Sequence, residues 1–281
     1  MTSAGTRGVV KVLSGVPATD GAGVRMTRVI ANEQLDHFDP FLLLDEFRSD
    51  DPGDYIAGFP DHPHRGFETV TYMLAGAMKH GDNKGNTGLL GPGSVQWMTA
   101  GRGIVHSEMP QQEDGLMWGF QLWVNLPADQ KMVEPRYQDI PASDVPETRP
   151  GKNVSVRVIA GELDGVTGPV SGVATEPFYF DVRCEGSAEV RLPTPENHNV
   201  FAYPYVGDIS IDGDAGTIVP RGNIALLGPG TSVSVATGDS ANFILVGGKP
   251  LNEPVARYGP FVMNTADEIR QAIMDFQAGR F

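Results

Sequence analysis

Residues 60–72 read PDHPHRGFETVTY, a histidine pair followed directly by an alternating run. Val70, Tyr72 and Leu74 take one side of that run, and threonines take the other. Alternation with a period of two predicts a β-strand. The stretch therefore places His62 and His64 at the entrance to a strand, where they are either metal ligands or ordinary loop or core histidines.

Short alternating segments recur along the chain, for example NVSVRVIAG (153–161) and FYFDVR (178–183). Gly, Pro, Asn or Asp separates most of them, and the 281 residues include 35 Gly and 22 Pro. Many short strands joined by tight turns indicate an all-β sandwich or barrel.

One helix is predicted near the C-terminal end, over TADEIRQAIMDFQAG (265–279). Thr265 and Glu268 have the spacing of a capping box, and Gly279 is placed to end the helix. Its apolar residues recur at helical spacing, which predicts one packed face. These residues are Ile269, Ala272, Ile273 and Phe276.

The chain also repeats itself. LLGPG occurs at 89–93 and at 226–230, a shift of 226 − 89 = 137, and YMLAG (72–76) resembles YPYVG (203–207), a shift of 131. The order and near-equal spacing of these matches predict two copies of one β module. The polar stretch PASDVPETRPGKN (141–153) reads as the divide, so we expect one domain over 1–140 and a second over 141–281 that ends in the helix.

Two further candidate ligands follow in the first copy. GRGIVHSEMP (101–110) supplies His106 and Glu108, again one residue apart. Residues i and i+2 of a strand share a face, so two neighbouring strands could bring His62, His64, His106 and Glu108 to one point. A set of imidazoles and a carboxylate without thiolate suits Fe(II), Mn, Co, Ni or Cu, and would leave positions open for substrate and O₂.

The second copy serves as an internal comparison. Shifts of 131 and 137 carry the four candidates onto Pro193, Pro195, Phe243 and Leu245. None of these side chains can bind a metal. We therefore expect the metal in the first domain alone.

Composition narrows the setting and the partners. There are 21 basic and 35 acidic residues, a formal charge of −14, which disfavours nucleic acid and anionic membranes as direct partners. Cys184 is the only cysteine, so no internal disulfide can form, and a reducing cytoplasm is the expected location. No apolar stretch approaches the ~20 residues of a membrane span, and the start lacks a signal-peptide pattern. We expect a monomer.

Several blocks resemble the pirin family of the cupin superfamily: HPHRGFETVTY (62–72), VQWMTAGRGIVHSEMP (95–110), LWVNLP (122–127), KMVEPRYQ (131–138) and GPFVMNT (259–265). The resemblance covers nearly the whole chain. It implies a bicupin, two jelly-roll β-barrels face to face, with one iron in the N-terminal barrel bound by His62, His64, His106 and Glu108. It also implies that the C-terminal helix packs back against the N-terminal domain.

The resemblance implies two competing functions. The first is a quercetin 2,3-dioxygenase, which cleaves a flavonol with O₂ and releases carbon monoxide; Glu108 would also be its catalytic base. The alternative is a non-enzymatic, iron- and redox-dependent transcriptional co-regulator that binds a protein partner. The general cupin pattern His-x-His-x₃-Glu would use Glu68 as the acid; we expect Glu108 to bind and Glu68 to support the site.

Overall fold

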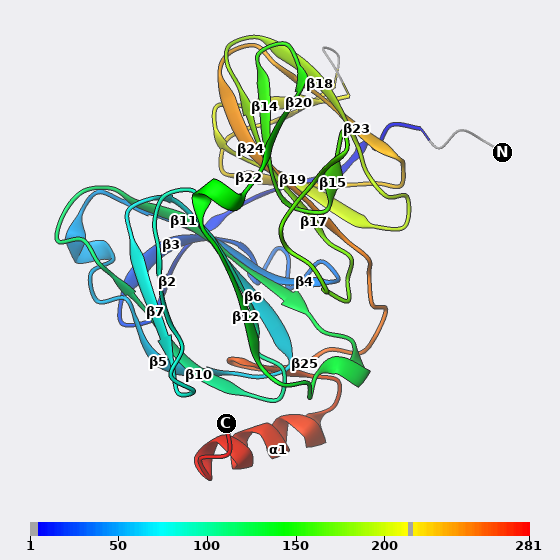
Figure 1. Cartoon of the computed structure of the whole chain (residues 1–281). Coiled ribbons are helices and arrows are strands. Elements are labelled where there is room, and N and C mark those ends of the chain that lie inside the picture. Colours follow the sequence, from blue (N-terminus) through cyan, green and yellow to red (C-terminus); the bar gives the residue numbers. More distant parts are fainter. Residues whose placement is uncertain (1–4, 213–215) are drawn as a thin grey trace. The chain divides into compact units, whose positions relative to one another are not determined.

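The computed structural model describes residues 5–212 and 216–281 (Figure 1). Its contacts divide the chain into two compact units. The first comprises Val16–Ser143 with Leu251–Phe281, and the second comprises Asp144–Pro250 with the described part of Met1–Gly15. The division near residue 143 lies close to the expected 140/141, whereas at both ends of the chain the units differ from the contiguous domains 1–140 and 141–281.

The unit that carries the histidine pair is built from two antiparallel sheets. The larger has seven strands in the order β12 (Arg136–Ile140), β9 (Val95–Thr99), β6 (Phe67–Ala75), β11 (Met117–Asn125), β4 (Phe41–Ser49), β3 (Val24–Ile30) and β2 (Val16–Asp20). The smaller has four, in the order β5 (Phe59–His64), β10 (Ile104–Pro110), β7 (Met78–Asp82) and β8 (Thr87–Leu90). Short 3-10 turns lie at Pro52–Asp54, Ala128–Gln130 and Ala142–Asp144.

The second unit has the same plan. Its seven-stranded sheet runs β1 (Val9–Ser14), β22 (Asn223–Leu227), β19 (Asn199–Val206), β24 (Ala241–Gly248), β17 (Phe178–Cys184), β14 (Val154–Ala160) and β13 (Glu147–Gly151). Its four-stranded sheet runs β18 (Ala188–Pro193), β23 (Ser232–Thr237), β20 (Ile209–Ile211) and β21 (Thr217–Val219). A small hairpin joins β15 (Glu162–Leu163) to β16 (Val166–Thr167).

Matching strand order confirms the predicted repeat, with one exchange. Strand β6 corresponds to β19 and β9 to β22, so YMLAG and YPYVG lie in equivalent strands. The edge place of β12 in the first copy is taken in the second by β1, which comes from the start of the chain. The N-terminal segment therefore completes the sheet of the second copy.

The alignment through LLGPG is wrong. Residues 89–93 run from the end of β8 into the turn before β9, whereas Leu226 and Leu227 lie within β22, the counterpart of β9. The equivalent strands start 223 − 95 = 128 residues apart, and β10 and β23 start 232 − 104 = 128 residues apart. A shift of 137 therefore lands one strand too far, and it carried two of the compared positions into β24.

The C-terminal segment returns to the first unit. Strands β25 (Ala256–Tyr258) and β26 (Phe261–Met263) form a hairpin, and α1 (Ala266–Gln277) follows it, shown in red in Figure 1. The predicted capping box is present, with Thr265 as N-cap, which leaves fewer amides at the helix start without a partner. Ile269 and Ala272 are buried as expected, while Phe276 is 39% exposed.

Buried Arg65 connects the helix to the strand that carries the histidines. Its guanidinium makes a 2.8 Å ion pair with Asp275 of α1 and lies 4.3 Å from the ring centre of Phe281. This pairing keeps the pKa of the Asp275 carboxyl well below its usual range. The charge of Arg65 is thus already paired within the protein.

Strands with alternating apolar residues bury those residues in the core of the second unit. Val154, Val156 and Val158 of β14 pack with Phe180 and Val182 of β17 in one apolar cluster. Cys184 belongs to the same cluster. No helix among the described residues is long and apolar enough to cross a membrane.

Burial makes Cys184 a reporter of unfolding. Loss of hydration raises the pKa of its thiol to about 11, so at pH 8 only about one thiol in a thousand is ionised. We expect a thiol reagent to react at least about 100-fold more slowly with the native protein than with protein in guanidinium chloride. Time courses of dithionitrobenzoate reaction measure this; equal rates would contradict the buried placement.

Candidate metal centre

Strands β5 and β10 place the three histidines together. The two strands are antiparallel neighbours, with His106 directly opposite His62 and Ile104 opposite His64. One ring nitrogen from each of His62, His64 and His106 lies within 4.8 Å of the others, and their ring centroids are 4.4 to 4.9 Å apart. The structure thus brings these three sequence candidates to one point.

Glu108 follows His106 after an irregularity in the strand pairing. Its carboxylate is 4% exposed and lines the cavity next to the imidazoles, outside the group of nitrogens within 4.8 Å. Oxygen Oε1 of Glu108 accepts a 2.8 Å hydrogen bond from the hydroxyl of Thr71. Glu108 therefore lies beside the histidine cluster with one oxygen already engaged.

Glu68 does not share a face with His62 and His64, because the chain turns a corner between them at Gly66. Strand β5 ends at His64 and β6 begins at Phe67, with Gly66 at φ +88° between them. A side chain at Gly66 would also collide with the Val262 carbonyl. Glu68 is three residues from Thr71 on β6, hence on the opposite face, where its Oε1 accepts a 2.6 Å hydrogen bond from Thr99.

The protonation of the imidazoles suits metal binding. His62 Nδ1 lies 2.8 Å from the Pro60 carbonyl, which can only accept, so Nδ1 carries the proton and Nε2 keeps its lone pair. Burial, together with the neighbouring imidazoles, lowers the pKa of His64 and of His106 well below the usual value. Both rings are therefore neutral at pH 7, the form that binds metals.

Unsatisfied nitrogens test the fit of a metal ion. Within residues 5–212 and 216–281, both ring nitrogens of His106 and Nδ1 of His64 are buried without a hydrogen-bond partner. Leaving such groups unpaired costs about 1–3 kcal/mol each. Three imidazoles facing one another, with a carboxylate beside them, fit a divalent cation.

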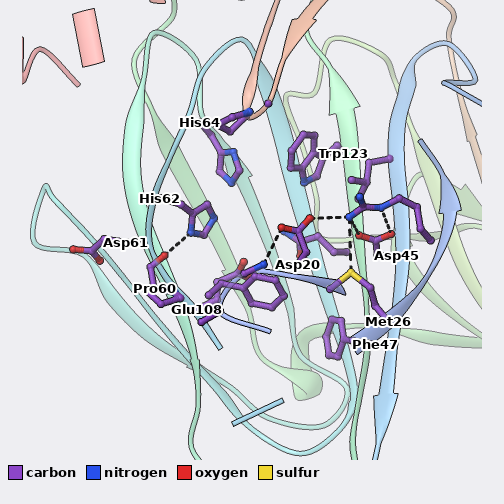
Figure 2. A pocket seen from close by; sticks show the side chains of 18 of the residues that line it. Asp20, Met26, Asp45, Phe47, Pro60, Asp61, His62, His64, Glu108 and Trp123 are labelled. Carbon is purple, nitrogen blue, oxygen red and sulfur yellow. Dashed lines mark hydrogen bonds and ion pairs between the residues drawn. The ribbon is translucent and has the colours of Figure 1, made fainter. Parts of the chain in front are cut away.

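The cluster opens on a cavity of about 540 Å³. Figure 2 shows His62, His64 and Glu108 on one side of it and Met26, Phe47 and Asp45 on the other. Trp123 lies between them and contacts the His64 ring edge-on, with centroids 5.2 Å apart. A pocket of this size with mostly apolar walls and a few polar groups is typical of sites for small organic molecules.

The wall opposite the histidines carries fixed charges. Arg28 makes two hydrogen bonds to the Asp45 carboxylate, at 3.0 and 2.8 Å, and a third to Asp20 at 2.8 Å. The pKa of Arg28 is raised, first by the bond to Asp45, so the guanidinium stays charged, while burial raises the pKa of Asp45 itself. Arg257, at 4.9 Å from the ring centre of Trp123, is a further cation lining the cavity.

Two family models match the chain. One described as Pirin matches residues 23–124, and one described as the Pirin C-terminal cupin domain matches residues 179–281. The chain belongs to the pirin family. Its two units are therefore cupin domains, which confirms the predicted all-β bicupin with a C-terminal helix.

The relatives of this pirin-family chain carry two kinds of name, quercetin 2,3-dioxygenase and pirin. A Pseudomonas aeruginosa protein named "Putative quercetin 2,3-dioxygenase" is 47% identical over 97% of both chains. Human Pirin is 46% identical over 92% of this chain and 88% of its own. A crystal structure described as quercetin 2,3-dioxygenase from Acinetobacter baumannii is 33% identical, with a TM-score of 0.91 over 98% of each chain.

The second cupin domain of this pirin-family chain has no counterpart of the histidine cluster. Strands β18 and β23 take the places of β5 and β10, and their directly opposite pairs include Leu192 with Val233 and Val190 with Val235. All four of these second-domain residues are buried in the apolar cluster. The positions compared in the sequence were wrong, yet the side chains at the corrected positions also cannot bind a metal.

Sequence reasoning missed three polar residues around the site. His80 reads as part of a polar loop, KHGDNKGN, but lies in β7 opposite Glu108, is 1% exposed and stacks on Tyr137. Thr71 and Gln121 have the pattern of ordinary strand residues. Only the pairing of β6 with β11 places Thr71 opposite Gln121, which lines the cavity. Cross-strand partners far apart in sequence leave no local signal.

Proposed function

We propose that this chain is a metal-dependent dioxygenase of the quercetin 2,3-dioxygenase type, with a flavonol and O₂ as substrates. The observation that carries the proposal is the cluster of three imidazoles opening on a cavity of about 540 Å³. The names of the Pseudomonas and Acinetobacter relatives support it. The reaction would open the flavonol ring and release carbon monoxide.

In this proposal His62, His64, His106 and Glu108 hold the metal, which is Fe(II) by preference. The bound ion would supply a Lewis-acid and O₂-binding centre. The imidazole nitrogens and the Glu108 carboxylate are borderline and hard donors, which also accept Mn, Co, Ni or Cu. The assay described below therefore compares all five metals.

The chain's own residues would do the rest. Trp123, Phe47 and Met26 provide apolar surface for an aromatic ring system and exclude water from it. Glu108, whose Oε1 accepts a hydrogen bond from Thr71, would accept the proton of the flavonol hydroxyl as base. In this proposal the 3-hydroxyl of the flavonol would enter between Glu108 and the three histidines.

An oxygen-uptake assay tests the proposal. Protein stripped by a chelator is reconstituted anaerobically with Fe(II), Mn, Co, Ni or Cu in turn, and quercetin in air-saturated buffer is then added. We expect at least one metal to support consumption of about one O₂ per flavonol with release of carbon monoxide. Metal-free protein and free metal serve as blanks; no uptake with any of the five metals would overturn the proposal.

A further inference from the structure

The hydroxyl of Thr71 joins the two sheets inside the metal-side unit. Thr71 lies in β6 of the seven-stranded sheet and is 1% exposed. Its Oγ1 lies 2.8 Å from Glu108 Oε1, in β10 of the four-stranded sheet, and 2.7 Å from Gln121 Oε1, directly opposite on β11. Three side chains from three strands thus form one hydrogen-bonded chain.

The protons set the direction of that chain. A hydroxyl has one proton, and of its two partners Gln121 can turn its amide to present a donor, so Thr71 donates to Glu108. Gln121 then satisfies the contact by turning its amide, so that its NH₂ donates to Thr71. Gln121 also lines the cavity, so the chain runs from the cavity wall through Thr71 to Glu108.

We propose that Thr71, oriented by Gln121, is a positioning residue that holds Glu108 in a single orientation beside the histidine cluster. With Oε1 held by the Thr71 hydroxyl, Glu108 would bind the metal chiefly through Oε2. This inference rests on the proposed metal site. It goes beyond that proposal by naming what sets the geometry of the fourth ligand.

The molecule contains a matched comparison. Thr99 of β9 donates to Glu68 Oε1 at 2.6 Å, a second buried threonine–glutamate pair, here with both residues in the seven-stranded sheet. Both threonines are almost fully buried, so removing either hydroxyl leaves a buried carboxylate oxygen without its donor. Only the Thr71 pair faces the histidine cavity, so only its loss should alter a bound metal.

The test uses Co(II) as the probe, because its visible spectrum reports the number and kind of its ligands. The full-length chain and its Thr71→Val, Thr71→Ser and Thr99→Val variants are titrated with Co(II) after chelator treatment. We expect Thr71→Val to bind Co(II) about 10- to 100-fold more weakly with an altered spectrum, and Thr71→Ser to restore both. Thr99→Val should match the unmodified protein in Co(II) binding, and unfolding temperatures confirm that each variant folds.

Other results would overturn the inference. Unchanged Co(II) affinity and spectrum in Thr71→Val would show that the hydroxyl does not position Glu108. Equal changes in Thr71→Val and Thr99→Val would show general loosening of the sheet. These readouts do not depend on flavonol turnover; unmodified protein that fails to bind Co(II) would instead remove the metal site and this inference with it.

Discussion

Replacing His106 by asparagine is expected to reduce bound Fe(II) from about one ion per chain to less than about a tenth of that. Quercetin-dependent O₂ uptake should fall by at least about 1000-fold. The physical reason is that His106 is 1% exposed and its two ring nitrogens have no protein partner in the described residues, so its lone pair is free for a metal alone. Metal analysis of the desalted protein and an oxygen electrode measure the two effects.

His198 supplies the control for that variant. It is the histidine of the second unit, also buried, but its Nε2 lies 2.7 Å from the Glu176 carbonyl and so has a partner in the protein. His198→Asn should keep its full metal content. Stoichiometric iron in His106→Asn, or equal losses in both variants, would contradict the assignment of the cluster.

The second large effect separates the two candidate acids. Glu108→Gln keeps the shape of the side chain but removes the charge beside the histidines, so we expect metal affinity to fall about 10- to 100-fold and O₂ uptake by about 1000-fold. Glu68→Gln should retain its metal, because Glu68 lies on the far face of β6, bonded to Thr99. Its expected loss is in stability, about 1–3 kcal/mol for the disturbed buried pair.

Parallel titration with Fe(II) under anaerobic conditions, followed by chemical denaturation, measures both variants. Burial raises the pKa of Glu68, whereas the hydrogen bond from Thr99 lowers it. Complete loss of metal in Glu68→Gln alone would transfer the ligand role from Glu108 to Glu68.

Local pattern was enough for much of the fold. Alternation identified the strands that form the two barrels, and the capping box identified α1 from its N-cap onward. Spacing of i and i+2 put His62 with His64 and His106 with Glu108, because strand geometry fixes that relation without tertiary information. The structure then supplied the pairing of β5 with β10 that brings the two pairs together.

The failures arose where local pattern cannot reach. Gly66 separates strand β5 from strand β6. Counting alternate residues from His64 therefore cannot tell which face of β6 carries Glu68. The LLGPG repeat is a true identity of letters in two different strands, because loops of unequal length separate the equivalent elements. Thr71 and Gln121 depend on cross-strand register, which a single sequence does not encode locally.

The first barrel includes the C-terminal segment Leu251–Phe281, so the ribosome completes the sequence of this barrel last. Gly259 and Pro260, which line the histidine cavity, belong to Leu251–Phe281, a segment that a ribosome makes only after the whole of the second barrel. The nascent first barrel therefore waits with one wall of its pocket missing while roughly a hundred further residues emerge. A metal ion that met the nascent chain before that point would find the pocket without Gly259 and Pro260.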